Sequence, residues 1–178
     1  MKTKRNILSS QDFKRIITRI SHEIIEKHKG TENLALVGIQ TRGDFLAKRL
    51  ADQIQSIENV TLPVGSMDIN MYRDDWTKIT RQPTVRPSNI PFSVDDMEII
   101  LVDDVLFTGR TIRAAMDALM DFGRPSRIEL AILVDRGHRE LPIQADYKGI
   151  FVDTEHQEKI CVLVEEHDKQ DIVFIEQD

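Results

Sequence analysis

Apolar residues recur at helical spacing in three stretches of the chain. The first stretch follows Ser9 and Asp12, a pair typical of a capping box, and precedes Gly30, a common helix stop. The start and stop signals agree with the spacing of the apolar residues, so both predict a helix between Ser9 and Gly30. The helices predicted in this way cover residues 10–29, about 45–54 and about 112–119.

Short continuous apolar runs separate the helical stretches and are typical of buried strands. The predicted strands cover residues 34–39, 60–71, 98–102, 128–134, 150–152, 160–164 and 172–175. Strands that alternate with helices indicate an α/β fold with a mostly parallel central sheet flanked by helices. A chain of 178 residues fits one domain, so we expect a single domain over residues 1–178.

Residues 68–91 interrupt the pattern with a polar segment that is rich in Arg and Lys and holds three prolines. Loops of this length are uncommon in compact domains unless they act as lids or are disordered. The residues alone leave open a flexible surface insertion and a lid.

Charge is unevenly distributed along the chain. The whole chain is −6, which excludes a globally cationic nucleic-acid binder, but residues 1–30 hold eight Lys/Arg against three Asp/Glu. An anionic partner should therefore meet the N-terminal segment. We expect no export signal and no membrane span, and the single cysteine, Cys161, excludes an intrachain disulfide and favours a cytoplasmic protein.

The strongest chemical signal lies in residues 98–111. Asp103 and Asp104 follow an apolar strand, and doubly wound sheets bind ligands at the carboxyl ends of their strands. Residues 108–111 then open a helix with successive N–H groups and two hydroxyls, which suit a phosphate, while Gly109 permits close approach. The acids suit sugar hydroxyls or a metal. The alternative is a solvated strand end followed by an ordinary N-cap.

A second loop, residues 38–44, has the same strand-to-helix position. Its Thr41, Arg42 and Gly43 could offer N–H groups and a guanidinium to a pyrophosphate, although a turn with a surface arginine is the simpler alternative. The chain lacks the glycine-rich signatures GxGxxG and GxxxxGK[ST], so a kinase or a dehydrogenase is not supported.

The run VDDVLFTGRT resembles the ribose-phosphate signature of the type I phosphoribosyltransferases. The resemblance implies their fold, with a small hood and a flexible lid over about residues 68–91. It makes Asp103 and Asp104 catalytic and gives Thr41, Arg42 and Gly43 to a pyrophosphate loop, which in that family often holds a strained or cis peptide. The implied phosphate loop comprises Val105, Leu106, Phe107, Thr108, Gly109, Arg110 and Thr111, and the implied lid residues are Tyr72, Arg73 and Arg86.

Four longer segments, LVGIQTRG, DINMYRDD, VDDVLFTGRTIRAAMDAL and LVDRGHRELPIQADYKG, narrow the resemblance. Together they resemble the family of bifunctional pyrimidine operon regulators and uracil phosphoribosyltransferases, PyrR. The implied reaction converts uracil and 5-phosphoribosyl 1-diphosphate to UMP and diphosphate with Mg²⁺. Uracil would lie under a hood of about residues 135–165, lined by Val134, Asp135, Arg136 and Ile160. A surface ion pair is the alternative for Arg136, and a purine base is the alternative substrate.

The same resemblance implies binding to the mRNA leader of pyrimidine genes, strengthened by UMP or UTP, and a homodimer or tetramer. The implied RNA-binding residues are Thr18, Arg19, His22, His138 and Arg139. Gln144 stands where family members often have arginine, which would remove about one phosphate contact. A transferase with weak or lost RNA binding therefore stays open. We expect His28, His156 and His167 on the surface and Cys161 as a buried thiol.

Overall fold

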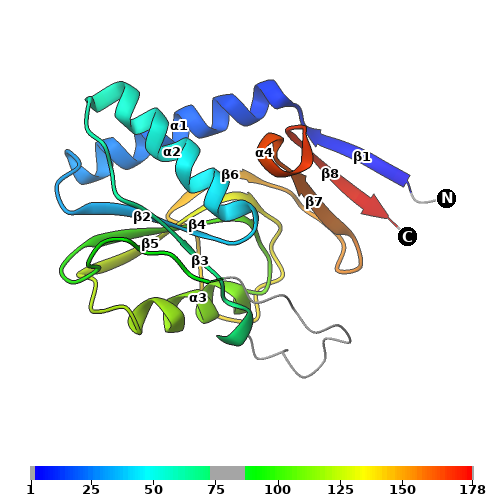
Figure 1. The fold of residues 1–178 in the computed structure, drawn as a ribbon. Helices are drawn as coiled ribbons and strands as arrows, with labels where there is room; N and C mark the ends of the chain where they lie inside the picture. Colours follow the sequence, from blue (N-terminus) through cyan, green and yellow to red (C-terminus); the bar gives the residue numbers. More distant parts are fainter. Residues whose placement is uncertain (1–2, 73–86, 178) are drawn as a thin grey trace.

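The computed structural model describes residues 3–72 and 87–177, which form two sheets (Figure 1). The larger sheet is parallel and has the strand order β3-β2-β4-β5-β6. Its strands are β2 (Leu34–Ile39), β3 (Val64–Met67), β4 (Glu98–Leu106), β5 (Arg127–Asp135) and β6 (Tyr147–Phe151). This arrangement confirms the expected mostly parallel α/β fold.

Helices cover both faces of the parallel sheet (Figure 1). Helices α1 (Ser10–His28) and α2 (Arg42–Glu58) pack on one face against the side chains of Leu36 and Ile100. Helix α3 (Arg110–Met120) packs on the other face against Val37 and Leu101. Successive residues of a strand point to opposite faces, so a strand buried on both faces needs a residue without polar side-chain atoms at every position, as in β2.

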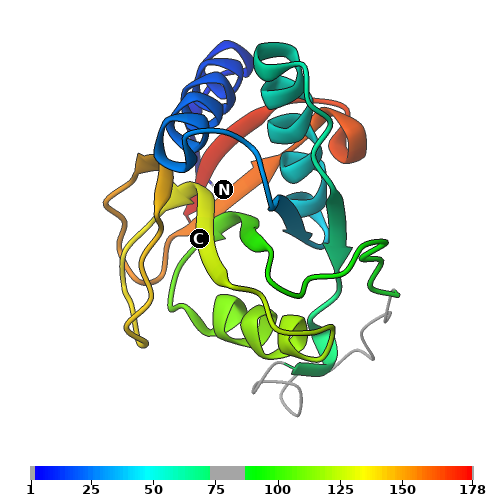
Figure 2. The same ribbon diagram turned by 90° about the vertical axis from the view of Figure 1, so that its left-hand side faces the viewer.

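The smaller sheet is antiparallel and joins the two ends of the chain, in the order β1-β8-β7. Its strands are β1 (Thr3–Leu8), β7 (Lys159–Leu163) and β8 (Ile172–Gln177), and the short helix α4 (Glu165–Asp168) connects the last two. Figure 2 shows this sheet from a second side. The sequence predicted β7 and β8 but not β1, so this sheet extends well beyond the expected hood over residues 135–165.

Several element boundaries differ from the expected ones. The capping box at Ser9 and Asp12 is present, and α1 ends one residue early because Lys29 is already left-handed, with φ of 54°. Strand β3 covers only four of the twelve residues predicted between 60 and 71, since its ladder with β2 is confined to them. Strand β4 is four residues longer than expected because its pairing with β5 continues to Leu106. Within residues 3–72 and 87–177, no helix could span a membrane.

Candidate active site

The paired acids lie in the last part of β4, not after it. Asp103 is buried, and its Oδ1 accepts from the Asp104 backbone N–H at 2.9 Å. Asp104 in turn accepts from the Val105 N–H at 2.8 Å. Burial raises the pKa of Asp104, and the nearby positive charge of Arg42 opposes this effect. The site thus holds one carboxyl group that binds its proton more tightly than usual.

The expected phosphate loop follows directly and ends at the amino terminus of α3. Gly109 is the N-cap of that helix and has φ of 93°, in the left-handed region that favours glycine. Thr108 Oγ1 accepts from the Arg110 N–H at 3.3 Å. The first turn of any helix leaves backbone N–H groups without partners inside the helix, and these carry the positive end of the helix dipole. This loop therefore has the donors that bind an anion.

The phosphate loop packs against residues 137–143, which follow β5. The carbonyl of Thr108 accepts from the N–H groups of Glu140 and Leu141, at 2.9 and 3.2 Å. The Arg110 Nε donates to Glu140 Oε2 at 2.6 Å, although both side chains are about half exposed. The two segments are thereby joined by main-chain and side-chain bonds.

The expected pyrophosphate loop lies beside the acids. The Gln40–Thr41 peptide is cis, the feature that the resemblance implied for this loop, and α2 begins at Arg42. A Cβ atom on Gly43 would lie 2.3 Å from the Val102 carbonyl oxygen and 3.2 Å from the Asp103 Cα. Only glycine fits so close to β4. The structure thus brings the amino ends of α2 and α3 to the same edge of the sheet, on either side of the acids.

The guanidinium of Arg42 is paired with an acid of the neighbouring helix α4, and its expected contact with pyrophosphate stays a prediction. It forms two hydrogen bonds to Asp168 of α4, Nε to Oδ2 and Nη2 to Oδ1, each at 3.0 Å. These bonds raise the pKa of Arg42 and lower that of Asp168. The arginine of the first loop therefore ties this loop to α4, and its charge also acts on Asp104.

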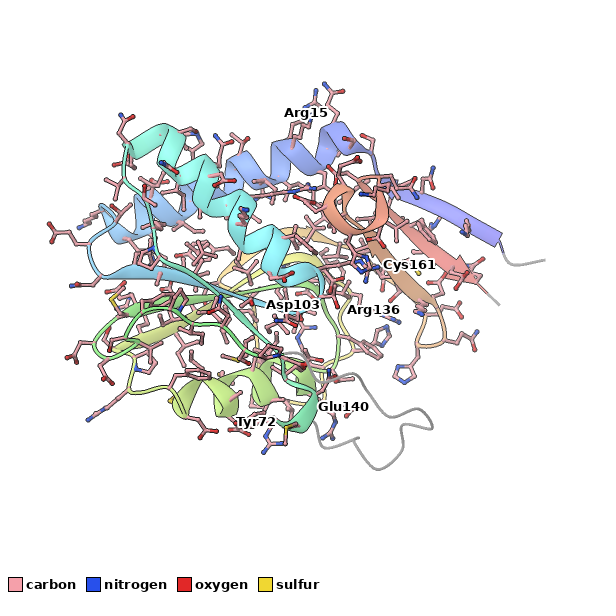
Figure 3. The ribbon with its side chains drawn as sticks, in the orientation of Figure 1. Arg15, Tyr72, Asp103, Arg136, Glu140 and Cys161 are labelled. Carbon is pink, nitrogen blue, oxygen red and sulfur yellow. The ribbon has the colours of Figure 1, made fainter. Side chains whose placement is uncertain are left out.

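The residues expected to surround the base lie at the end of β5 and on β7 of the smaller sheet. Val134 and Ile160 are buried, as is Arg136, which at 6% exposure is not the surface ion pair of the alternative interpretation. The Arg136 guanidinium stacks on the Phe107 ring, with 4.1 Å from Cζ to the centroid. In Figure 3, Arg136 lies between Asp103 and the small sheet that carries Cys161.

Arg136 also fixes the segment that precedes β7. Its Nε donates to Thr154 Oγ1 at 3.2 Å, and its Nη2 donates to the carbonyls of Glu155 and His156 at 3.0 and 3.3 Å. Burial lowers the pKa of Arg136. The side chain therefore ties the end of β5 to the segment before β7.

The structure divides the residues expected to bind RNA into two groups. Thr18, Arg19 and His22 lie on α1, where Arg19 pairs with Glu23 at 2.6 Å. The Arg139 guanidinium points inward, bonding to the carbonyls of Phe107 at 2.8 Å, Ile143 at 2.9 Å and Gly137 at 3.1 Å.

An ion pair of 2.7 Å between Asp135 and Arg139 completes this inward set of contacts. Arg139 thus holds the segment after β5 against the phosphate loop, and its expected role in RNA binding stays a prediction. His138 is exposed, and its Nε2 lies 2.7 Å from the Thr154 carbonyl oxygen.

The expected lid is only partly within the described residues. Tyr72 ends the short helix η1 (Asn70–Tyr72), and its hydroxyl donates to Asp121 just after α3. Arg73 and Arg86 lie outside the described residues, so their expected roles stay predictions.

Two expectations about single residues are wrong. His28 is not a surface residue: its side chain is 6% exposed and lies between Glu98 at 2.5 Å and Glu129 at 2.9 Å. Glu98 and Glu129 lie at or near the starts of two apolar strands, and this pattern could have indicated that they have a buried partner such as His28. Cys161 is half-buried instead of fully buried. His156 and His167 are exposed, as expected.

The structure thus places the acids of VDDVLFTGRT, the run that resembles the ribose-phosphate signature of the type I phosphoribosyltransferases, between the amino ends of α2 and α3. The family model for the phosphoribosyl transferase domain matches residues 4–168. The chain is 55% identical over 170 residues to a protein named Bifunctional protein PyrR from Deinococcus radiodurans, covering 96% of this chain and 93% of that one. The chain therefore belongs to the phosphoribosyltransferase family and, within it, to the PyrR proteins.

Further comparisons agree with this assignment. A Bifunctional protein PyrR from Bacillus cereus (strain B4264) is 55% identical over 177 residues, with 98% of both chains covered. Among solved structures, the hypoxanthine phosphoribosyltransferase of Trypanosoma cruzi matches with a TM-score of 0.73 at 16% identity, covering 98% of this chain and 97% of that one. A hypoxanthine phosphoribosyltransferase from Staphylococcus aureus matches with a TM-score of 0.66 at 20% identity, covering 85% and 79%. At these identities the two structures confirm the fold alone.

Proposed function

We propose that this chain converts uracil and 5-phosphoribosyl 1-diphosphate to UMP and diphosphate. We also propose that it regulates pyrimidine operons by uridine-nucleotide-dependent binding to their mRNA leaders, which is transcription attenuation. The observation that carries the enzymatic half is the position of Asp103 and Asp104 between the amino ends of α2 and α3. Two anion sites on either side of two carboxylates match a substrate with a phosphate at one end and a diphosphate at the other.

Each group in the site has a role in this reaction. The first turn of α3, with Thr108 to Thr111, holds the 5-phosphate, and the backbone of Thr41 to Gly43 holds the diphosphate. Asp103 and Asp104 bind the ribose hydroxyls and stabilise the positive charge that develops on the sugar carbon as its bond to diphosphate breaks. The bond to N1 of uracil then forms and N1 loses its proton. We assign that proton to Asp104, because burial raises its pKa.

Magnesium fits this site as an ion held mainly by the substrate. Residues 3–72 and 87–177 hold no group of three or more His, Cys, Asp or Glu side chains that could bind a metal by themselves. Two carboxylates beside a diphosphate site can complete the oxygen shell that Mg²⁺ prefers. When bound, the ion would neutralise charge on the leaving diphosphate.

The base pocket holds uracil between the end of β5 and the smaller sheet. Val134, Asp135 and the main chain of Arg136 line one side, and Ile160 of β7 lines the other. Arg136 keeps this pocket in shape through its bonds to residues 154–156. Enclosure matters because water would otherwise attack the electron-poor sugar carbon.

The regulatory half rests on membership of the PyrR proteins and on the α1 face that carries Thr18, Arg19 and His22. We expect a homodimer or tetramer and a cytoplasmic protein. Gel shifts with the leader RNA of the chain's own pyrimidine genes, with and without UMP, test this half. Binding that neither UMP nor the Arg19→Gln substitution changes would contradict it.

The enzymatic half is tested by incubating the purified chain with Mg²⁺, 5-phosphoribosyl 1-diphosphate and each candidate base. We expect UMP from uracil and no nucleotide from hypoxanthine or guanine. Asp104→Asn should slow UMP formation by a factor on the order of 10² to 10³, whereas Asp52→Asn, a change of an exposed acid on α2, should leave the rate unchanged. Equal turnover of the two variants, or a preference for a purine base, would overturn the assignment.

A further inference from the structure

A groove of about 320 Å³ lies at the β6 edge of the parallel sheet. Its walls come from the segment that follows β5 and from β6 itself, and they include Gln144, Lys148 and Phe151. None of these three side chains has a role in the reaction described above. The groove shares Asp135 with the proposed base site, but the transferase activity does not explain its other wall.

Phe151 is the apolar part of the groove. Its side chain is 57% exposed and lies outside the core, which is unusual for a phenylalanine. The ring lies over the backbone of the turn at Gly137, where an added Cβ would be 3.7 Å from Cε2. The turn therefore contacts part of the ring, and more than half of the side chain stays exposed to a ligand.

Two polar side chains flank this ring. The Lys148 Nζ lies 5.7 Å from the Phe151 ring centroid. Its acidic neighbour, Asp135, is 3.9 Å away and is already paired with Arg139 at 2.7 Å, so the ammonium group of Lys148 is only weakly neutralised. Gln144 is exposed and adds an amide that can both donate and accept hydrogen bonds.

The groove is continuous with the α1 face proposed for RNA. Arg19 Nη2 donates to the carbonyls of Gly149 and Lys148, at 2.5 and 3.1 Å. These bonds fix α1 against β6, and Figure 2 shows the helix beside this strand. An RNA that contacts Arg19 or His22 would therefore reach Lys148 and Phe151 without leaving the surface.

This set of groups fits one unpaired nucleotide. Unstacked RNA bases are recognised by stacking on aromatic side chains and by hydrogen bonds to their edges, while lysine contacts the phosphate. A second copy of this chain fits less well, because the cores of protein interfaces are depleted of charged groups and this groove holds three of them.

We propose that this groove binds one unpaired nucleotide of the leader RNA, with its base stacked on Phe151 and a phosphate on Lys148. The proposal rests on the RNA binding proposed above. The groove thus extends the RNA-binding surface from the helix face of α1 to the sheet edge.

The test measures binding of the leader RNA of the chain's own pyrimidine genes, with UMP present, over a series of salt concentrations. Phe151→Ala and Phe151→Leu should each weaken binding about ten-fold, because leucine keeps the apolar area but not the aromatic face. Lys148→Gln should lower the slope of log affinity against log salt by about 0.7. Lys48→Gln, a matched change of an exposed lysine on α2, should alter neither quantity.

A spectroscopic measurement locates the base. 2-Aminopurine placed at each unpaired position of the RNA loop should lose fluorescence at one position on binding, and this loss should be absent with Phe151→Leu. UMP formation and melting temperature should match the unaltered chain in every variant, which separates lost stacking from misfolding.

Other results would overturn the proposal in recognisable ways. If the variants of Phe151 and Lys148 bind the RNA as well as the unaltered chain does, the nucleotide site is contradicted. The proposed function would be unaffected by that result. Variants of Phe151 that change only the sedimentation of the protein would make the groove an interface between copies of this chain. A chain that makes UMP but binds no leader RNA removes the regulatory half of the proposed function, and this site with it.

Discussion

Burial raises the pKa of the Asp104 carboxyl, and the charge of Arg42 opposes this effect only in part. A carboxyl group whose pKa is raised by folding favours the folded state at low pH. This contribution is complete below its unfolded pKa and is lost as the pH rises through its folded pKa. At neutral pH the ionised carboxylate of Asp104 therefore lowers the stability of the free protein, although the reaction needs this carboxylate.

Asp104→Asn should consequently raise the melting temperature at about pH 8 and leave it almost unchanged at about pH 3, because both side chains are then neutral. The same substitution should lower kcat by a factor on the order of 10² to 10³, since one group that stabilises developing charge is removed. Scanning calorimetry at both pH values, with initial rates of UMP formation, measures the two effects. A variant that is less stable at about pH 8 would show that the carboxylate stabilises the fold.

Gly43 holds the pyrophosphate loop against β4. A Cβ at this position would lie 2.3 Å from the Val102 carbonyl oxygen, which belongs to the backbone of a central strand and cannot move aside cheaply. Gly43→Ala should therefore destabilise the protein by about 1–3 kcal/mol and displace the loop. We expect a raised KM for 5-phosphoribosyl 1-diphosphate and an unchanged KM for uracil, measured by initial rates.

At the scale of elements, α4 supports the first loop through Asp168. This carboxylate accepts two hydrogen bonds from Arg42 and one, at 2.9 Å, from the Val164 N–H. Asp168→Asn should loosen Arg42 and the loop that begins with it. We expect KM for 5-phosphoribosyl 1-diphosphate to rise several-fold, with a smaller change in kcat and none in KM for uracil. Asp168→Glu should restore part of the affinity because it keeps the charge; equal losses in both variants would indicate a purely structural effect.

Sequence patterns predicted the elements whose apolar positions are periodic. The capping box of α1 and the apolar run of β2 are local signals, and both elements are present. β1 was missed because its first residues include Lys4, Arg5 and Asn6, and its strand structure depends on pairing with β8 at the other end of the chain. The carboxyl end of β4 was missed because two acids ended the apolar run, whereas pairing with β5 continues.

The sequence predicted the positions of those site residues that act through their main chain or through their place at the end of a strand. The acids, both loops and the helix that follows each loop lie at one edge of the sheet, as the strand-to-helix pattern indicated. The partners of Arg42, Arg136 and Arg139 were not predictable. Each guanidinium bonds to atoms brought close only by the folded chain, most of them main-chain carbonyls that leave no trace in the sequence.

At the scale of the whole molecule, the parallel sheet has a reactive end and a structural end. Opposite the acids, near the starts of β4 and β5, Glu129 accepts from the Tyr147 hydroxyl at 2.6 Å and pairs with Lys27 at 2.9 Å. His28 connects this carboxylate to Glu98. The network joins the end of α1 to three strands of the sheet and stands far from the loops that bind substrate.

This network should set the acid stability of the protein. Burial alone would raise the pKa of Glu129, but hydrogen bonds from Tyr147, Lys27 and His28 more than reverse the effect and lower it to about 2. Because folding lowers this pKa, the contribution of Glu129 to stability is present above its unfolded pKa and is lost as the pH falls through about 2.

Glu129→Gln should therefore lower the free energy of unfolding at about pH 7 by about 2–3 kcal/mol, a deficit that shrinks below about pH 4 and vanishes near pH 2. Urea unfolding across this pH range measures the difference, and Glu32→Gln, an exposed glutamate before β2, is the matched control. UMP formation per folded molecule should be unchanged, since the network lies at the opposite end of the strands from Asp103. A deficit that stays constant from about pH 7 to about pH 2 would contradict the role assigned to the Glu129 charge and leave only its packing.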